Sequence, residues 1–210
     1  MALLGVSKVI VVIQSEDVLF EKFLRSYKHT GIEVGISHQE DVNGLGGAIL
    51  SIESKVRGNF VVILGDDFTI SKNIQSFADF FTVNGSLNTQ AYVKEYSLNK
   101  IHQSCGISLG VNSRINDIVE KPMQSEFKYR GIGLYLLNNE IFKALKETTL
   151  VNNELRLTDA LRKLSHAGLL LGYEIEGLNI NINTIDDLND ARSFMYKQFK
   201  GRSAIDPPYI

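Results

Sequence analysis

Two adjacent carboxylates follow a buried strand, where they could hold a hard cation. Residues 59–64 (NFVVIL) form a nearly continuous apolar run, which is typical of a strand buried on both faces, and Gly65, Asp66 and Asp67 follow it. Mg2+ prefers carboxylate oxygens, and ligands of open α/β sheets lie beyond the carboxyl ends of the strands. The pair therefore favours a metal site over the alternative, in which either aspartate caps the next turn.

A lysine at the end of a second predicted strand could bind an anion. The segment Glu120-Lys121-Pro122 closes the predicted strand 114–120. A lysine that is placed by a strand and followed by a proline can present one positive charge to a phosphate. The alternative is a solvent-facing Glu–Lys pair, which is common and contributes little to stability. Taken alone, the segment favours this alternative.

A glycine-rich segment, QEDVNGLGGA over 39–48, joins a predicted strand to a predicted helix. The amide of Gln39 can both donate and accept hydrogen bonds, as the polar edge of a flat ligand requires. Glycines let the backbone approach a flat ligand because no Cβ stands in the way. The segment by itself favours a plain strand-to-helix turn.

The order of the predicted elements indicates how these residues are positioned. The first half alternates strands with helices, as βαβ units do: strands 8–14, 32–38 and 59–64, and helices 15–27, 44–56 and 74–81. The second half predicts short, partly antiparallel strands and three helices: strands 89–97, 106–109, 114–120, 129–137, 169–176 and 179–182, and helices from 138, over 157–166 and over 185–199. We predict an α/β fold with a Rossmann-like, mostly parallel sheet beside an antiparallel half. One domain covers 1–200, and we expect a loose tail over 201–210.

The composition fits a globular chain in a reducing compartment. The 210 residues carry a formal net charge of −2, and the basic residues are scattered, which argues against a nucleic-acid or anionic-membrane partner. The single cysteine, Cys105, allows no internal disulfide, and the four histidines lack metal-ligand spacing. No stretch is long enough to span a bilayer, and the N-terminus lacks a signal-peptide pattern, so we expect a cytoplasmic protein.

Four segments, in this order, resemble the sugar-1-phosphate nucleotidyltransferases, the family that makes nucleotide sugars such as UDP-glucose or dTDP-glucose. They are QEDVNGLGGA (39–48), ILGDD (63–67), IVEKP (118–122) with Gly133-Leu134-Tyr135, and ELRLTD (154–159) with Asn183, Thr184, Asp187 and Leu188. The similarity runs from about the first residue to near 199. It implies a GT-A-like nucleotidyltransferase core whose antiparallel half binds the sugar.

The resemblance assigns roles to the nucleotide side of the site. It implies that Gln39, Gly44 and Leu45 hold the base of a nucleoside triphosphate and that Asp66 binds Mg2+. Lys121 would bind the phosphate of the sugar phosphate. Asp66 and Lys121 are thus expected to converge on one cleft, where a metal and a phosphate meet.

The resemblance also assigns roles to the sugar side. Glu120 would bind sugar hydroxyls, Gly106 would let the sugar approach the backbone, and Glu154 and Thr158 would be the sugar-binding acid and the threonine at a helix start. The alternative for the last two is a capping arrangement with Asn153 as N-cap, and both can hold together. Cys105 is expected to pack and not to act as a nucleophile, since no partner that could activate it is near in sequence.

Two features depart from the family pattern. The family begins with a strand and a basic, glycine-rich loop that wraps the triphosphate; no segment here matches them, and 1–5 aligns with the end of the helix that follows that loop. The second magnesium ligand of the family is an aspartate, and Asn181 stands at that position. We therefore expect weaker metal binding and weaker neutralisation of the phosphates, and losing one such electrostatic group commonly costs about a hundredfold in rate.

Three functions remain as hypotheses. The first is transfer of a nucleoside monophosphate from a nucleoside triphosphate to a sugar-1-phosphate, which gives a nucleotide sugar and pyrophosphate. The second is a degenerate relative that binds a nucleotide or sugar phosphate without turnover, which Asn181 favours. The third is a GT-A-type glycosyltransferase that uses Asp66 and Asp67 as its metal motif, against which the segments 118–122 and 154–159 speak. Because the central strand of the parallel half has no counterpart, its place could be filled by the chain's own N-terminus or by a second copy in a homo-oligomer.

Overall fold

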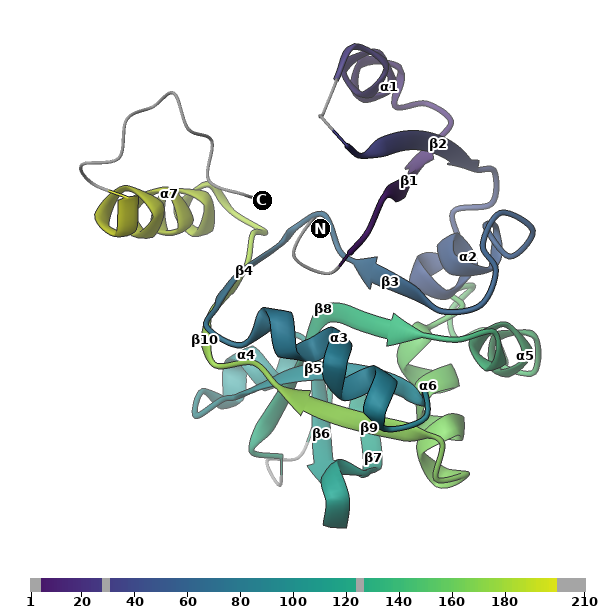
Figure 1. Cartoon of the computed structure of the whole chain (residues 1–210), viewed down its shortest axis with the longest axis vertical. Coiled ribbons are helices and arrows are strands. Elements are labelled where there is room, and N and C mark those ends of the chain that lie inside the picture. Colours follow the sequence, from purple (N-terminus) through teal and green to yellow (C-terminus); the bar gives the residue numbers. More distant parts are fainter. Residues whose placement is uncertain (1–4, 28–30, 124–126, 200–210) are drawn as a thin grey trace.

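The computed structural model describes residues 5–27, 31–123 and 127–199 (Figure 1). Its centre is a six-stranded sheet in which β8 (Tyr129–Leu137) is the longest strand. The strand order is β7 (Ile115–Glu120), β6 (Cys105–Leu109), β8, β5 (Asn88–Lys94) and β9 (Leu170–Glu174), and β3 (Phe60–Ile63) also pairs with β8. The expected loose tail, 201–210, lies outside the described residues.

Two strands share one edge of β8, and this arrangement creates the site described below. Strand β6 pairs with the first part of β8, up to Gly131, and β3 pairs with its last part, from Leu134. Both run antiparallel to β8, so the carboxyl end of β3 faces the amino end of β6 across the interval between them. Residues that follow β3 and residues that begin β6 are therefore brought to the same place.

Helices cover both faces of this sheet. On one face, α2 (Gly44–Leu50), α5 (Glu140–Lys146) and α6 (Leu157–His166) pack over a core that includes Ile107, Ile118 and Leu137. Helix α6 buries Leu157, Ala160, Leu161 and Leu164, whose spacing defines a single apolar face. On the other face, α3 (Ile74–Val83) buries Phe77 and Phe81 against β5 and β8.

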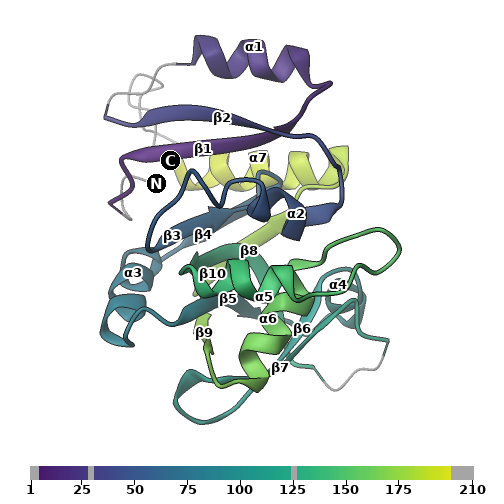
Figure 2. The same cartoon turned by 90° about the vertical axis from the view of Figure 1, so that its right-hand side faces the viewer.

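Two small sheets flank the central one. Strands β1 (Lys8–Gln14) and β2 (Glu33–Gln39) pair in parallel through α1 (Val18–Ser26), and all three lie at one end of the molecule (Figures 1 and 2). Strands β4 (Asp67–Ser71) and β10 (Gly177–Asn181) pair antiparallel, and β10 leads into α7 (Ile185–Phe199). The remaining short helices are α4 (Leu98–His102) and the 3-10 turn η2 (Val111–Ser113).

The predicted α/β class is confirmed, but the sheet is mixed and not mostly parallel. Of the seven strand pairs among the described residues, only β1–β2 and β5–β9 are parallel. Strand β3 was expected to join the parallel set, yet its partner in the described chain is β8, which runs the opposite way. The reason is that an apolar run says nothing about strand direction. The expected burial of this strand on both faces is also wrong, because β3 is only partly buried and Ile63 is exposed. In the described part of the chain, no helix combines the length and apolarity that crossing a bilayer demands.

Candidate functional site

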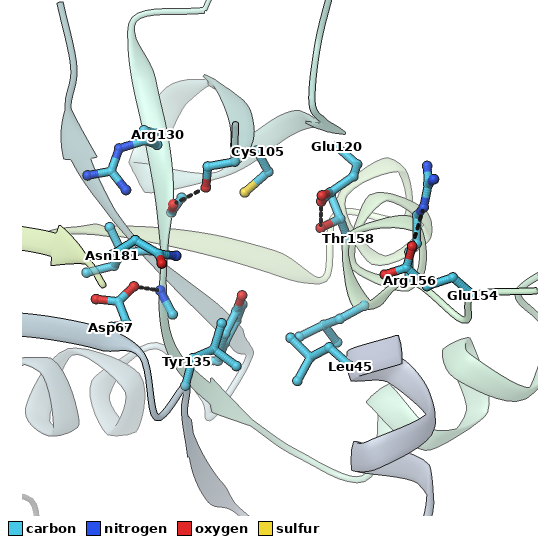
Figure 3. Close-up of a pocket in the computed structure, with 16 residues that line it drawn as sticks. Leu45, Asp67, Cys105, Glu120, Arg130, Tyr135, Glu154, Arg156, Thr158 and Asn181 are labelled. Carbon is cyan, nitrogen blue, oxygen red and sulfur yellow. Dashed lines mark hydrogen bonds and ion pairs between the residues drawn. The ribbon is translucent and has the colours of Figure 1, made fainter. Parts of the chain in front are cut away.

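A cavity of about 170 Å³ opens at the interval between β3 and β6. Its floor is the middle of β8, from Arg130 to Gly133, and its walls come from six other segments of the chain (Figure 3). The side chains and backbone that line it include Leu45, Leu64, Asp67, Ser104, Cys105, Glu120, Tyr135, Glu154, Arg156, Thr158 and Asn181. The topology thus gathers at one place residues that lie far apart in the sequence.

One wall of the cavity carries a fixed carboxylate. The Thr158 hydroxyl, in the first turn of α6, donates a 2.7 Å hydrogen bond to Oε2 of Glu120 at the end of β7. Further along this wall, Nε of Arg156 lies 3.3 Å from Oε2 of Glu154. Carboxylates that are held in this way can accept hydrogen bonds from the hydroxyls of a polar ligand.

The opposite wall carries Asp67 and Asn181, which face each other in the pairing of β4 with β10. The Asp67 carboxylate accepts hydrogen bonds from the backbone N–H of Gly133 at 2.5 Å, from the Thr69 hydroxyl at 3.0 Å, and from the Asn179 amide. Its oxygens are therefore committed to structural bonds. Asn181 keeps its amide oxygen near the cavity, where it accepts a 2.8 Å hydrogen bond from the Asn183 amide.

The two residues expected to converge on a cleft, Asp66 and Lys121, are not among the residues that line this cavity. Their neighbours Asp67 and Glu120 line it instead. Asp66 is exposed, and its carbonyl oxygen accepts a 2.7 Å hydrogen bond from the N–H of Ile182, which holds it beside Asn181. Lys121 is also exposed; its backbone has a φ of 43° and its N–H donates to the carbonyl of Ser104.

The glycine-rich segment closes one end of the cavity. Leu45 lines it, and Gly44, with a φ of 87°, packs so tightly that an added Cβ would lie 2.4 Å from Cγ of Glu154. The Gln39 amide donates to the carbonyl of Asp41 at 2.8 Å and to the carbonyl of Gly44 at 3.3 Å. Gln39 therefore braces its own loop, and the loop is fixed against Glu154.

The structure gives Gly106 a packing contact. A Cβ added there would lie 2.5 Å from Cγ of Phe127, so the ring occupies the space beside the backbone. A sugar could reach the Gly106 backbone on that side only if Phe127 moved. The adjacent Cys105 thiol is buried in the cavity wall, and burial raises its pKa to about 12. The thiol is therefore neutral near pH 7, as a packing role requires.

Of the ten residues for which the resemblance implies a place in the binding or metal site, five line the cavity: Leu45, Glu120, Glu154, Thr158 and Asn181. Four others adjoin a lining residue in the chain: Gly44, Asp66, Gly106 and Lys121. The fifth, Gln39, is hydrogen-bonded to the carbonyl of Gly44. Within the described residues, no cluster of three or more His, Cys, Asp or Glu side chains could hold a metal ion.

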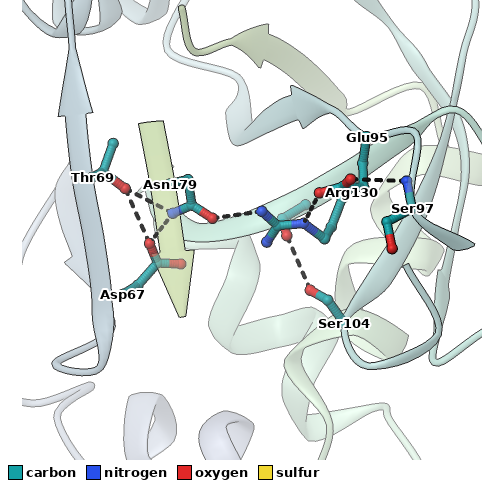
Figure 4. Close-up of polar contacts among 8 residues, drawn as sticks. Asp67, Thr69, Glu95, Ser97, Ser104, Arg130 and Asn179 are labelled. Carbon is teal, nitrogen blue, oxygen red and sulfur yellow. Dashed lines mark hydrogen bonds and ion pairs between the residues drawn. The ribbon is translucent and has the colours of Figure 1, made fainter. Parts of the chain in front are cut away.

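Sequence reasoning missed Arg130, which lies in the floor of the cavity on β8. Its side chain is only 7% exposed, and its partners Glu95 and Asn179 come from distant parts of the chain (Figure 4). One signal for it exists in the sequence. Arg130 is the only charged residue within an otherwise uncharged strand, YRGIGLYLL.

Comparisons with known proteins identify the family of this chain. The sequence pattern of the nucleotidyl transferase family matches residues 1–197. The bifunctional protein GlmU of Methanococcus maripaludis (strain DSM 14266) is 31% identical over 142 residues, which are 66% of this chain and 32% of that protein. The UTP--glucose-1-phosphate uridylyltransferase of Pseudomonas aeruginosa is 27% identical over 191 residues, which are 85% of this chain and 68% of that protein.

A solved structure of UDP-glucose pyrophosphorylase complexed with UDP-glucose superposes with a TM-score of 0.83 and 23% identity, covering 94% of this chain and 83% of that one. At this identity the likeness shows the fold, and it confirms the predicted nucleotidyltransferase-like core. The chain spans about a third of the length of the GlmU proteins that it matches. Because the family pattern covers nearly all of the sequence, this chain belongs to the nucleotidyl transferase family.

Proposed function

We propose that this chain is the core of a sugar-1-phosphate nucleotidyltransferase. Such an enzyme transfers a nucleoside monophosphate from a nucleoside triphosphate to a sugar-1-phosphate and releases pyrophosphate. The observation that carries the proposal is the Glu120–Thr158 hydrogen bond in the cavity wall, opposite Asp67 and Asn181. It joins two of the segments that resemble the family, and it fixes a carboxylate where sugar hydroxyls would lie.

The reaction requires little covalent chemistry from the protein itself. An oxygen of the sugar phosphate attacks the α-phosphorus in line, the bond from the α-phosphorus to the bridging oxygen breaks, and pyrophosphate leaves. The attacking oxygen is already anionic, so the chain needs no general base. Its residues therefore act by positioning the two substrates and by neutralising charge.

Each residue beside the cavity has a proposed part in that positioning. Glu120 and Glu154 accept hydrogen bonds from sugar hydroxyls, and Thr158 fixes the orientation of the Glu120 carboxylate. Lys121, which is exposed and follows Glu120 in the chain, approaches a phosphate. On the nucleotide side, the base lies against Leu45 and the backbone of the loop that Gln39 and Gly44 shape, and Gly106 gives the sugar access once Phe127 moves aside.

A divalent metal ion, which nucleotidyl transferases generally use, would neutralise the phosphates in this site. We propose Mg2+, with Asp66 and Asn181 as the residues that would hold it. The backbone bond from Ile182 to Asp66 keeps these two residues adjacent. Mg2+ is commonly bound through one or two carboxylates together with substrate phosphates, so one carboxylate and one amide oxygen are a sparse but workable set.

That sparse set is also the observation that favours a second candidate, a relative that binds its ligands without turnover. Asn181 brings no charge, and the Asp67 carboxylate is committed to Gly133, Thr69 and Asn179. In this case the cavity would still bind a nucleotide or a sugar phosphate. We also propose a cytoplasmic location and assembly as a homo-oligomer.

Two measurements on the purified chain separate the candidates. The first follows pyrophosphate release with Mg2+, glucose-1-phosphate and each of several nucleoside triphosphates. The second follows the thermal unfolding midpoint with the same compounds. Pyrophosphate release supports the enzyme, stabilisation without release supports the binding protein, and neither release nor stabilisation contradicts both.

A further inference from the structure

Arg130 is a buried cation in the floor of the cavity. It extends from β8, its side chain is 7% exposed, and it lines the cavity together with Asp67 and Asn181. Burying a guanidinium is costly unless charged or polar partners surround it. The charge of Arg130 must therefore be compensated by the groups around it.

The partners of Arg130 occupy only part of its hydrogen-bonding capacity. Its Nε lies 3.4 Å from Oε2 of Glu95, and its Nη2 donates a 2.8 Å hydrogen bond to Oδ1 of Asn179. Glu95 is shared, because its Oε1 accepts a 2.9 Å hydrogen bond from the N–H of Ser97. A guanidinium has five N–H donors, and Nη1 has no partner in the part of the chain that the structure describes.

The Arg130 side chain is also held in place. Asn179 bridges it to Asp67, since the Asn179 amide donates to the Asp67 carboxylate while its oxygen accepts from Arg130 (Figure 4). Asp67 is in turn fixed by the N–H of Gly133, in the same strand as Arg130. This chain of bonds holds the guanidinium at the cavity before a ligand binds. Such preorganisation favours affinity, because the side chain does not have to be ordered on binding.

The two sides of the cavity differ in their polar groups. One wall carries the Glu120 carboxylate with its Thr158 partner, and Arg130, Asn181 and Asp67 lie on the opposite side (Figure 3). The Glu120 carboxylate suits the hydroxyls of a ligand, and the N–H groups of Arg130 that lack a partner among the described residues suit its phosphate. The other arginine of the cavity, Arg156, lies on the hydroxyl-binding side and pairs with Glu154.

We propose that Arg130 binds the phosphate of the sugar phosphate or nucleotide sugar, with the sugar directed toward Glu120 and Thr158. Asn179 and Glu95 are positioning residues for it. The assignment rests on the proposed function, and it adds a cation that lines the cavity to the exposed Lys121. The fork of a guanidinium fits two phosphate oxygens at once, which a lysine cannot do.

Titration calorimetry with two probes tests the assignment: glucose-1-phosphate, and methyl α-glucoside, which carries no phosphate. Arg130→Gln keeps the length and polarity of the side chain but removes its charge. A hydrogen bond to a charged group is stronger than one between neutral groups. We therefore expect this variant to bind glucose-1-phosphate about ten- to a hundredfold more weakly than the wild type does. Its affinity for the glucoside stays within about twofold of the wild type, because the Glu120 wall is unchanged. Arg130→Lys loses less affinity for glucose-1-phosphate than Arg130→Gln does.

Controls separate this role from a structural one. Arg162→Gln removes a cation that is paired with Asp117 outside the cavity, and it should bind both probes as the wild type does. If Arg130→Gln unfolds, because Glu95 is left as an unpaired buried charge, the double variant Glu95→Gln/Arg130→Gln removes both charges and is measured in its place. Equal losses for both probes would mean a structural role and overturn the assignment.

The remaining outcomes also decide whether Arg130 binds the phosphate. If Arg130→Gln binds glucose-1-phosphate as tightly as the wild type while Lys121→Ala or Arg156→Gln loses it, the phosphate lies elsewhere and the Arg130 assignment is wrong. If the wild-type chain binds neither probe, the proposed function itself fails. The two failures are thus distinguishable.

Discussion

The Thr158 hydroxyl and the Glu120 carboxylate, 38 residues apart in sequence, are joined by a 2.7 Å hydrogen bond. The bond ties the end of β7 to the first turn of α6 and fixes one carboxylate in the wall of the cavity. A hydrogen bond to a charged group is stronger than one between neutral groups. The pair therefore links the stability of the α6–β7 contact to the shape of the proposed sugar-binding wall of the cavity.

Thr158→Val removes this bond and keeps the side-chain volume. We expect it to lower the free energy of unfolding by about 1–3 kcal/mol and to weaken glucose-1-phosphate binding, because the Glu120 carboxylate loses its orientation. Denaturant unfolding and calorimetry measure the two effects. Thr158→Ser should restore both, and Thr82→Val, which removes an exposed hydroxyl bond to the Ala78 carbonyl, should leave binding unchanged. Wild-type binding by Thr158→Val would show that the bond does not shape the site.

Gly44 and Gly58 form a matched pair for testing how the glycine-rich loop closes the cavity. Their φ values are 87° and 72°, but an added Cβ meets Glu154 at 2.4 Å at Gly44 and nothing within 4 Å at Gly58. Alanine at either position is strained by about 1 kcal/mol. We expect Gly44→Ala to lose about 1–3 kcal/mol more stability than Gly58→Ala does, through overpacking.

Thermal and denaturant unfolding of the two alanine variants measure this difference. Gly44→Ala should also weaken ligand binding, since it displaces the Glu154 side chain, whereas Gly58→Ala should not. Equal losses of stability would mean that Glu154 moves aside freely and that the loop is not locked.

Several elements could be predicted to the residue from the sequence. Strands Lys8–Gln14 and Tyr129–Leu137 are long apolar runs, and Leu157–His166 repeats its apolar residues at helical spacing. Strand Asp67–Ser71 was missed, because its short mixed sequence is stabilised by pairing with Gly177–Asn181, far along the chain. The direction of β3 was predicted wrongly for the same reason, since strand direction depends on partners that are distant in sequence.

The residues of the site also divide into those that the sequence predicts and those that depend on distant partners. Glu120, Thr158 and Leu45 could be predicted because they belong to segments whose order resembles the family. Arg130 was missed, because its one local signal is a charge within an uncharged strand and its partners Glu95 and Asn179 are 35 and 49 residues away. The choice of Asp67 over Asp66 as the lining residue likewise depends on the pairing of β4 with β10, which no local pattern encodes.

Asn181→Asp tests the proposed metal site. The change adds a carboxylate beside Asp66 and keeps an oxygen to accept the Asn183 amide hydrogen bond. We expect the variant to bind UTP more tightly in the presence of Mg2+, and to need about tenfold less Mg2+ for half-maximal binding, because carboxylates are the preferred ligands of this ion. Titration of UTP at a series of Mg2+ concentrations measures the effect. Asn99→Asp, which adds the same charge to an exposed residue of α4, is the control. An unchanged Mg2+ requirement would contradict the placement of the metal at Asn181.

The Cys105 thiol predicts a pH dependence. Burial raises its pKa to about 12 from an ordinary value of 9.0, so the folded state holds the proton more tightly than the unfolded state does. The stabilising contribution is complete below pH 9 and is lost as the pH rises toward 12. We expect the free energy of unfolding to fall over this interval, and less steeply in Cys105→Ala.

Alkylation measures the same property of Cys105 directly. At pH 8 the native chain should react with iodoacetamide at least about a hundredfold more slowly than the chain unfolded in guanidinium, because the thiolate is the reactive form and the native thiol is buried. Rapid labelling of the native protein would show that the thiol is exposed or ionised and that its part in the cavity wall is wrong.

Amide chemical shifts during titration with UDP-glucose test the central claim most directly. The account predicts that the largest changes fall on the residues of this cavity: Leu45, Glu120, Gly131, Gly133 and Thr158. Shifts confined to other surfaces, for example to Lys94, Tyr96, Leu98 and Tyr129, which line a separate hollow, or no shifts at all, would contradict it.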